Sequence, residues 1–126
     1  MVKLTKASVV VVDDDSMMRE MLKLILRSES YSVAGEAANG QDAIVLCGKL
    51  KPEVALLDIN MPGKDGLKAL EEIIRVSPAT KVLMVSADAT MDRVNDAIKK
   101  GAAGFVVKPL NSASILDRVA KCLNGK

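Results

Sequence analysis

Short apolar runs that alternate with helical patterns are the feature that most narrows the folds open to this chain. Each run is a few residues long, is rich in Val or Leu and lacks the polar alternation of a half-buried strand. The runs cover Val9–Val12, Val54–Leu57, Val82–Val85 and Phe105–Val107, with a weaker one at Tyr31–Ala34. Runs of this length and composition indicate strands buried on both faces of a sheet.

The segments between these runs carry apolar residues at the spacing of an amphipathic helix. The clearest pattern is Met18, Met21, Leu22, Ile25 and Leu26; the others are Ala43, Leu46, Cys47, Leu50, then Leu116, Val119, Ala120, Leu123, and less completely Leu67, Leu70, Ile74 and Met91, Val94, Ile98. Five strands alternating with five helices predict an α/β fold. In this fold right-handed crossovers cover both faces of a parallel sheet, so the sheet is doubly wound.

Composition supports one domain and argues against several classes of partner. A chain of 126 residues with 49% hydrophobic residues is long enough for one core. The formal charge of +2 comes from scattered residues of both signs, and the chain has one Tyr, one Phe and no Trp. We therefore expect no direct contact with nucleic acid, which needs basic patches or stacking rings. No run approaches the roughly 20 apolar residues of a membrane span, and the N-terminal residues lack a signal-peptide core, so we expect a cytoplasmic protein without a membrane contact.

The content of His and Cys limits the chemistry. The chain has no His, which removes the usual general base and the commonest zinc ligand. Cys47 and Cys122 form no CxxC pair, and isolated thiols within helical patterns usually are small buried hydrophobes. We expect no disulfide. Any chemistry must therefore use carboxylates, Lys and hydroxyl groups.

Polar residues collect where the predicted strands end. Asp13, Asp14 and Asp15 follow the first run, Asp58 follows the run Val54–Leu57, Ser86 follows the next, and Lys108 and Pro109 follow the last. Ligands of parallel α/β sheets bind at the carboxyl ends of the strands, so these side chains should converge at one edge.

Each of these residues also has an ordinary interpretation. Asp15 or Ser16 can cap the following helix, and for Asp15 we prefer that role. Ser86 can be a turn residue, and Lys108 an exposed charge before a proline. Taken together, however, carboxylates this close raise one another's pKa unless a cation binds. Mg²⁺ fits best, since it takes one or two carboxylates, keeps several waters and often contacts phosphate.

Four segments at four strand ends carry a family resemblance. The segments "VVVVDDDSMMR", "LLDINMPGKDGL", "VLMVSADA" and "GAAGFVVKPL", with "VAGEAANG" in addition, resemble the receiver domain of two-component response regulators. The resemblance covers nearly the whole chain, is strongest to chemotaxis-type single-domain regulators, and implies one receiver domain over residues 1–126. It also implies a flavodoxin-like sheet with strand order 2-1-3-4-5.

The resemblance assigns roles to individual residues. It implies that Asp58 is the phosphoacceptor, and that Asp13, Asp14 and Asp58 hold Mg²⁺ together with the backbone carbonyl of Asn60. Ser86 is expected to hydrogen-bond one phosphoryl oxygen and Lys108 to neutralise another. The donor would be a phosphohistidine of a sensor histidine kinase. The protein would be a phosphoacceptor that assists its own phosphorylation and dephosphorylation, without being an enzyme in the usual sense.

The resemblance also implies a switch and an output surface. Ser86 and Phe105 are expected to change together on phosphorylation, altering the surface of the fourth helix, fifth strand and fifth helix. An output protein or domain would bind there, and a phosphatase would be a separate partner. Phe105 stands where many relatives have Tyr, and its ordinary interpretation is a core aromatic. The Lys108–Pro109 bond is expected to be cis on resemblance only.

Three alternatives stay open at the level of sequence. A flavodoxin-like electron carrier needs a phosphate-binding loop after the first strand and aromatic residues beside the flavin, whereas here that loop is acidic. A Mg²⁺-dependent phosphatase with an aspartate nucleophile would carry a second Asp where this chain has Asn60. The chain can also be a receiver module cut from a larger DNA-binding response regulator.

Overall fold

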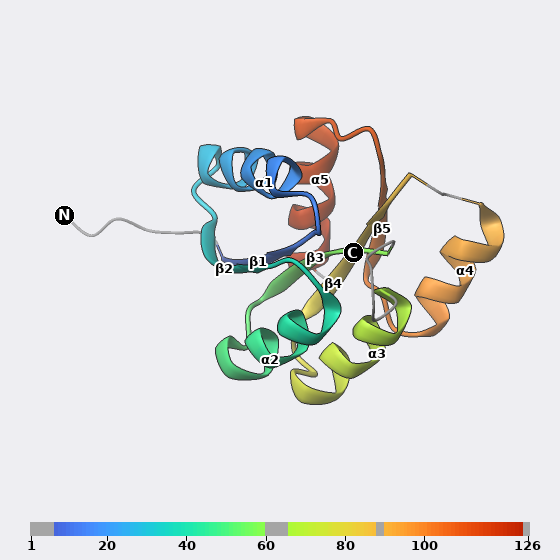
Figure 1. The fold of residues 1–126 in the computed structure, drawn as a ribbon. Coiled ribbons are helices and arrows are strands. Elements are labelled where there is room, and N and C mark those ends of the chain that lie inside the picture. Colours follow the sequence, from blue (N-terminus) through green and yellow to red (C-terminus); the bar gives the residue numbers. More distant parts are fainter. Residues whose placement is uncertain (1–6, 60–65, 88–89, 125–126) are drawn as a thin grey trace.

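The strands form the parallel sheet that the sequence predicts. The computed structural model describes residues 7–59, 66–87 and 90–124. Over these residues, five parallel strands pair in the order β2-β1-β3-β4-β5 (Figure 1). Their bounds are β1 Ser8–Val12, β2 Ser32–Ala37, β3 Val54–Asp58, β4 Lys81–Ser86 and β5 Gly104–Val107. The predicted α/β fold and strand order are therefore confirmed.

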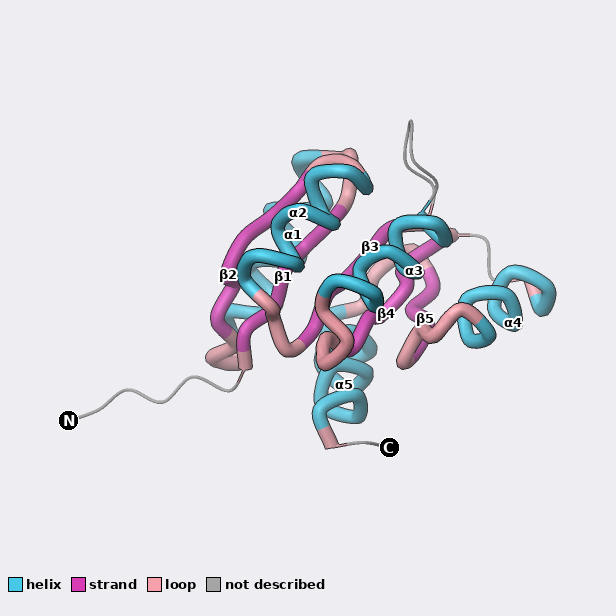
Figure 2. Tube along the Cα trace, turned by 90° about the horizontal axis from the view of Figure 1, so that it is seen from below, coloured by secondary structure: helices cyan, strands magenta, loops and turns pink. Residues whose placement is uncertain are grey.

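Helices cover both faces of this sheet. They are α1 Ser16–Ser28, α2 Gly40–Leu50, α3 Gly66–Val76, α4 Met91–Lys99 and α5 Ser112–Leu123. Figure 1 shows α1 and α5 on one face, and α2 and α3 on the other. Figure 2, which looks onto the sheet from the side of α2 and α3, shows α4 outermost, beside the β5 edge. The molecule is thus a three-layer α/β/α sandwich.

Alternate side chains of each central strand enter two separate cores. Val9 and Val11 of β1 pack with residues of α1 and α5, whereas Val10 and Val12 pack with residues of α2 and α3. Successive side chains of a strand point to opposite faces, so a strand covered on both faces must be apolar at every position. This explains the unbroken run of valines in β1, all four of which are at most 1% exposed.

Each of the five helical patterns of the sequence falls on a helix, but the apolar residues of these patterns are not all buried. Leu22 and Leu26 of α1 are fully buried, as predicted. In α4 the described core residue is Ala97, while Met91 and Ile98 are 71% and 49% exposed. The α4 helix lies beside the edge strand β5 and has little sheet to cover. Its apolar spacing therefore does not correspond to a packed stripe.

The first helix begins as the sequence predicts. Asp15 is the N-cap of α1, and its carboxylate accepts a hydrogen bond from the backbone N–H of Met17 at 2.9 Å.

The two cysteines are free and buried, Cys47 in the core beneath α2 and Cys122 in the core beneath α5. The expected absence of a disulfide between them agrees with their positions on opposite faces of the sheet. Within the described segments no helix has the length and apolar character that crossing a bilayer requires.

Candidate functional site

The parallel sheet brings the predicted residues to one edge. Asp13 directly follows β1, Asp58 ends β3, and Lys108 directly follows β5. The residues two positions before Asp13, Asp58 and Lys108 all belong to the core on the α1 and α5 side of the sheet. For Asp13 and Asp58 the residue four positions before belongs to the same core. Continued alternation turns these three side chains toward the same side of the sheet edge. Backbone hydrogen bonds from Ile59 to Val85 and from Lys108 to Ser86, at 3.1 and 2.9 Å, extend the sheet to this edge.

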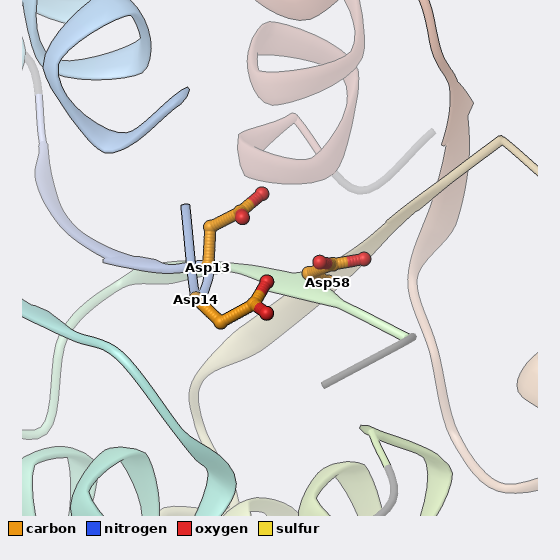
Figure 3. Close-up of side chains that lie close together, drawn as sticks. All are labelled: Asp13, Asp14 and Asp58. Carbon is orange, nitrogen blue, oxygen red and sulfur yellow. The ribbon is translucent and has the colours of Figure 1, made fainter. Parts of the chain in front are cut away.

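Three carboxylates form a cluster there. Asp13, Asp14 and Asp58 can each place one oxygen so that all three oxygens lie within 4.8 Å of one another. Figure 3 shows their side chains gathered at the ends of β1 and β3. Asp13 and Asp58 are only 1% and 4% exposed, while Asp14 is exposed to solvent. The cluster therefore has a buried floor and one open side.

Lys108 adds a positive charge to this cluster. Its Nζ lies 3.3 Å from Oδ2 of Asp13 and 3.6 Å from Oδ2 of Asp58. The peptide bond between Lys108 and Pro109 is cis, which confirms the expectation from the resemblance. The ammonium thus bridges two buried acids that come from two different strands.

Asp13 is held by several hydrogen bonds. Its backbone N–H donates to the carbonyl of Ala37 at 3.1 Å, and its Oδ1 accepts from the backbone N–H of Asp15 at 3.0 Å. Oδ2 is left facing Lys108. Asp15 itself points into the start of α1, so the structure separates it from the acidic cluster.

Ser86 and Phe105 lie on neighbouring strands. In the pairing of β4 with β5, Met84 is opposite Phe105 and Ser86 is opposite Val107. Ser86 is fully buried, and Phe105 is half-buried against the core beneath α2 and α3. Asn60, the remaining predicted metal ligand, lies outside the described residues.

The sequence analysis did not find Arg19, which contacts this site, or Glu36, which binds Arg19. Arg19 of α1 donates from Nη1 to the backbone carbonyl of Asp13 at 2.7 Å, and from Nε to Glu36 of β2 at 2.8 Å. The β1–β2 register, which pairs Val11 with Glu36, brings this carboxylate near the end of β1. The sequence does show a basic residue, Arg19, one turn into the first helix. Its pairing with Glu36 cannot be predicted from the sequence, because that pairing depends on the β1–β2 register.

Comparison with known proteins decides the family. The profile that describes the response regulator receiver domain matches residues 9–120. The chain belongs to this family. Receiver domains accept phosphoryl groups in two-component signalling and bind Mg²⁺ at an acidic pocket, in agreement with the cluster at the sheet edge.

Individual relatives agree with this assignment. The chemotaxis protein CheY of Listeria monocytogenes is 42% identical over 111 residues, which cover 88% of this chain and 93% of that protein. CheY of Thermotoga maritima is 40% identical over 113 residues, which cover 90% of this chain and 94% of that protein. These receiver domains are similar to this one over nearly their whole length.

Solved structures are equally similar. The receiver domain of the putative response regulator NarL from Mycobacterium tuberculosis has a TM-score of 0.90 and 38% identity, covering 98% of this chain and all of that one. The CheX-CheY-BeF3-Mg²⁺ complex from Borrelia burgdorferi has a TM-score of 0.89 and 33% identity, covering 93% of this chain and 89% of that one. The receiver fold therefore extends over almost all of the present chain.

Proposed function

We propose that this receiver domain is a phosphorylation-activated switch in which Asp58 accepts a phosphoryl group from the phosphohistidine of a sensor histidine kinase. The observation that carries the proposal is the position of Asp58 at the end of a buried central strand, beside Asp13, Asp14 and Lys108. A carboxylate held this firmly can meet an incoming phosphoryl group in line.

The residues of the cluster fit Mg²⁺. Three ionised carboxylates bring three negative charges, and Lys108 offsets one of them. A divalent ion would offset the remaining two. The oxygen donors suit a hard cation, and the exposed side at Asp14 leaves space for the waters that Mg²⁺ keeps. Asp13, Asp14 and Asp58 would hold the ion, with the backbone carbonyl of Asn60 as a further proposed ligand.

Phosphoryl transfer needs little covalent machinery. A carboxylate oxygen of Asp58 forms the new bond to phosphorus, the bond from phosphorus to the donor imidazole nitrogen breaks, and that nitrogen keeps the electron pair. Bound Mg²⁺ supplies neutralisation of the phosphoryl charge. Lys108 stabilises a second phosphoryl oxygen from its position between Asp13 and Asp58, and the hydroxyl of Ser86 donates a hydrogen bond to a third.

The phosphorylated domain would act through its α4-β5-α5 surface. Met91, Ile98 and Val107 of this surface are apolar and at least 49% exposed, which suits contact with an output protein or output domain. A phosphatase that removes the phosphoryl group would be a further partner. In this proposal the chain is one receiver domain over residues 1–126 and acts as a phosphoacceptor that assists its own phosphorylation and dephosphorylation.

The test is phosphate incorporation measured by intact mass. With acetyl phosphate and Mg²⁺ we expect one phosphate per chain, stable in acid and lost in base, as for an acyl phosphate. Asp58→Asn should abolish incorporation, whereas Asp117→Asn, which removes an exposed acid paired with Lys121 on α5, should retain it. Undiminished incorporation in Asp58→Asn would place the acceptor elsewhere.

A further inference from the structure

A side chain on α1 fixes the backbone between the first two acids of the cluster. Nη1 of Arg19 donates to the carbonyl oxygen of Asp13 at 2.7 Å. That carbonyl belongs to the peptide unit joining Asp13 to Asp14, so its orientation sets the directions in which both acidic side chains leave the backbone. The Arg19 side chain is 18% exposed, which makes this hydrogen bond partly shielded from water.

The guanidinium of Arg19 also binds the carboxylate of Glu36. Glu36 of β2 accepts from Nε of Arg19 at 2.8 Å, and its second oxygen accepts from Nζ of Lys23 at 2.6 Å. Hydrogen bonds from Lys23 and Arg19 keep the pKa of the Glu36 carboxyl below its usual value. Glu36 therefore stays ionised at neutral pH and anchors a planar group that also reaches Asp13.

The anchoring has a consequence for the acidic cluster. An unrestrained arginine beside three carboxylates would pair with them, since guanidinium and carboxylate match in charge and shape. Such pairing would occupy the oxygens that a metal needs. Glu36 instead draws the guanidinium toward β2, and the remaining Nη1 is directed at a neutral carbonyl oxygen.

We propose that Arg19 is a positioning residue of the metal site, and that Glu36 acts through Arg19 by directing its guanidinium to the Asp13 carbonyl. The inference rests on the proposed Mg²⁺-dependent function. The positioning role and a simple charge effect predict opposite changes in Mg²⁺ affinity when Arg19 is replaced. Removing a positive charge near three carboxylates strengthens cation binding by Coulomb attraction, whereas removing a positioning contact weakens it.

The experiment is a titration of the full chain with MgCl₂. The NMR chemical shifts of the backbone amides around Asp14 report the binding. For Arg19→Ala we expect the Kd for Mg²⁺ to rise about tenfold, the lower end of the range for groups that orient metal ligands. Arg19→Lys should also weaken binding, because an ammonium keeps the charge but cannot reproduce the planar two-sided contact. Arg75→Ala is the matched control: it removes an exposed arginine paired with Glu72 on α3 and should leave the Kd unchanged.

Glu36 is tested by a double-mutant cycle. Glu36→Gln should weaken Mg²⁺ binding in the parent protein and have no further effect in the Arg19→Ala background. Tighter binding in Arg19→Ala, or unchanged binding in Arg19→Lys, would overturn the positioning role; additive effects would overturn the action of Glu36 through Arg19. Urea unfolding in metal-free buffer verifies that each variant is folded. Failure of the parent protein to bind Mg²⁺ would overturn the proposed function and this inference together, whereas normal binding by the parent and both Arg19 variants overturns only the inference.

Discussion

Lys108 and Asp58 approach within 3.6 Å although β4 lies between the strands that carry them. The contact is possible because a lysine side chain is long enough to cross the end of one strand. The same Nζ lies 3.3 Å from Asp13, so one flexible cation contacts both buried acids of the cluster. A cation in this place competes with a metal for the carboxylates and yet stabilises charge that develops on a transferring phosphoryl group.

The variant Lys108→Met separates competition with the metal from stabilisation of the phosphoryl group. Without the ammonium we expect phosphorylation of Asp58 by acetyl phosphate to slow by about a hundredfold, the typical loss when one electrostatic donor is removed from such a site. Mg²⁺ should bind more tightly, since a competing positive charge is gone. Intact-mass time courses and a MgCl₂ titration measure the two quantities. Lys121→Met on α5, which removes a half-exposed lysine paired with Asp117, is the control. Weaker Mg²⁺ binding in Lys108→Met would contradict the competition.

Asp14 and Asp15 are adjacent but should differ in their effects. Asp14 belongs to the carboxylate cluster, whereas Asp15 accepts a hydrogen bond from Met17 as the N-cap of α1. We expect Asp14→Ala to abolish measurable Mg²⁺ binding. Asp15→Ala should retain binding and lower the free energy of unfolding by about 1 kcal/mol, the usual cost of losing a cap. Calorimetric Mg²⁺ titration and urea unfolding test both variants, and equal loss of binding in the two would contradict the assignment.

Gly66 has no room for a side chain. A Cβ at this first residue of α3 would lie 2.5 Å from Cα of Ile59 and 2.6 Å from the carbonyl oxygen of Asp58. Gly66→Ala must therefore displace the backbone at the phosphoacceptor, and we expect a loss of about 2 kcal/mol in the free energy of unfolding together with slower phosphorylation. Gly48→Ala in α2 is the matched control, because its Cβ would meet only Val76, at 3.4 Å. This change should stabilise by about 0.5–1 kcal/mol. A neutral effect of Gly66→Ala on both quantities would contradict the close approach.

Cys47 should resist thiol reagents in the folded protein. Burial raises the pKa of its thiol to about 11, so at pH 8 almost none of it is the reactive thiolate. With iodoacetamide at that pH we expect no labelling of the Cys47 peptide in native protein and full labelling in urea, as measured by peptide mass spectrometry. Rapid labelling of the native protein would show that α2 opens locally.

The part of the site that the sequence predicts is the part set by strand geometry. Asp13, Asp58 and Lys108 follow apolar runs, and parallel strands necessarily present their carboxyl ends together. Asp15 was also predictable, because capping depends on the residues that follow it directly. No knowledge of packing was needed for these assignments. The role of Asn60 stays a prediction.

The remaining features depend on how elements are placed against one another. The contact of Arg19 with Glu36 requires the register of β1 with β2 and the rotation of α1 above them. The exposure of Met91 and Ile98 follows from the position of α4 at the sheet edge, which their helical spacing does not reveal. Periodicity shows that a helix has an apolar face, but it does not show how much of that face another element covers.

The coupling of Ser86 to Phe105 is the prediction that links the site to its output. Register and strand alternation place the two side chains on the same face of neighbouring strands, since Ser86 is opposite Val107 and Phe105 is two positions earlier. Phe105 is half-buried and packs against the core beneath α2 and α3, at the edge strand of the sheet. We expect that movement of Ser86 toward a phosphoryl group shifts the population of Phe105 toward an inward rotamer.

Beryllofluoride with Mg²⁺ serves as the phosphoryl mimic in the test. In the parent protein we expect amide shifts around Asp14 and Asp58, at Phe105, and along α4 and α5. In Ser86→Ala the shifts near the two acids should remain and those at Phe105 should shrink, because the hydroxyl that responds to the phosphoryl group is missing. Ser28→Ala, at the end of α1, is the matched control and should behave as the parent. If the parent protein itself shows shifts only near the acids, Phe105 is a core aromatic and the coupling is wrong, while the phosphorylation chemistry of Asp58 is unaffected.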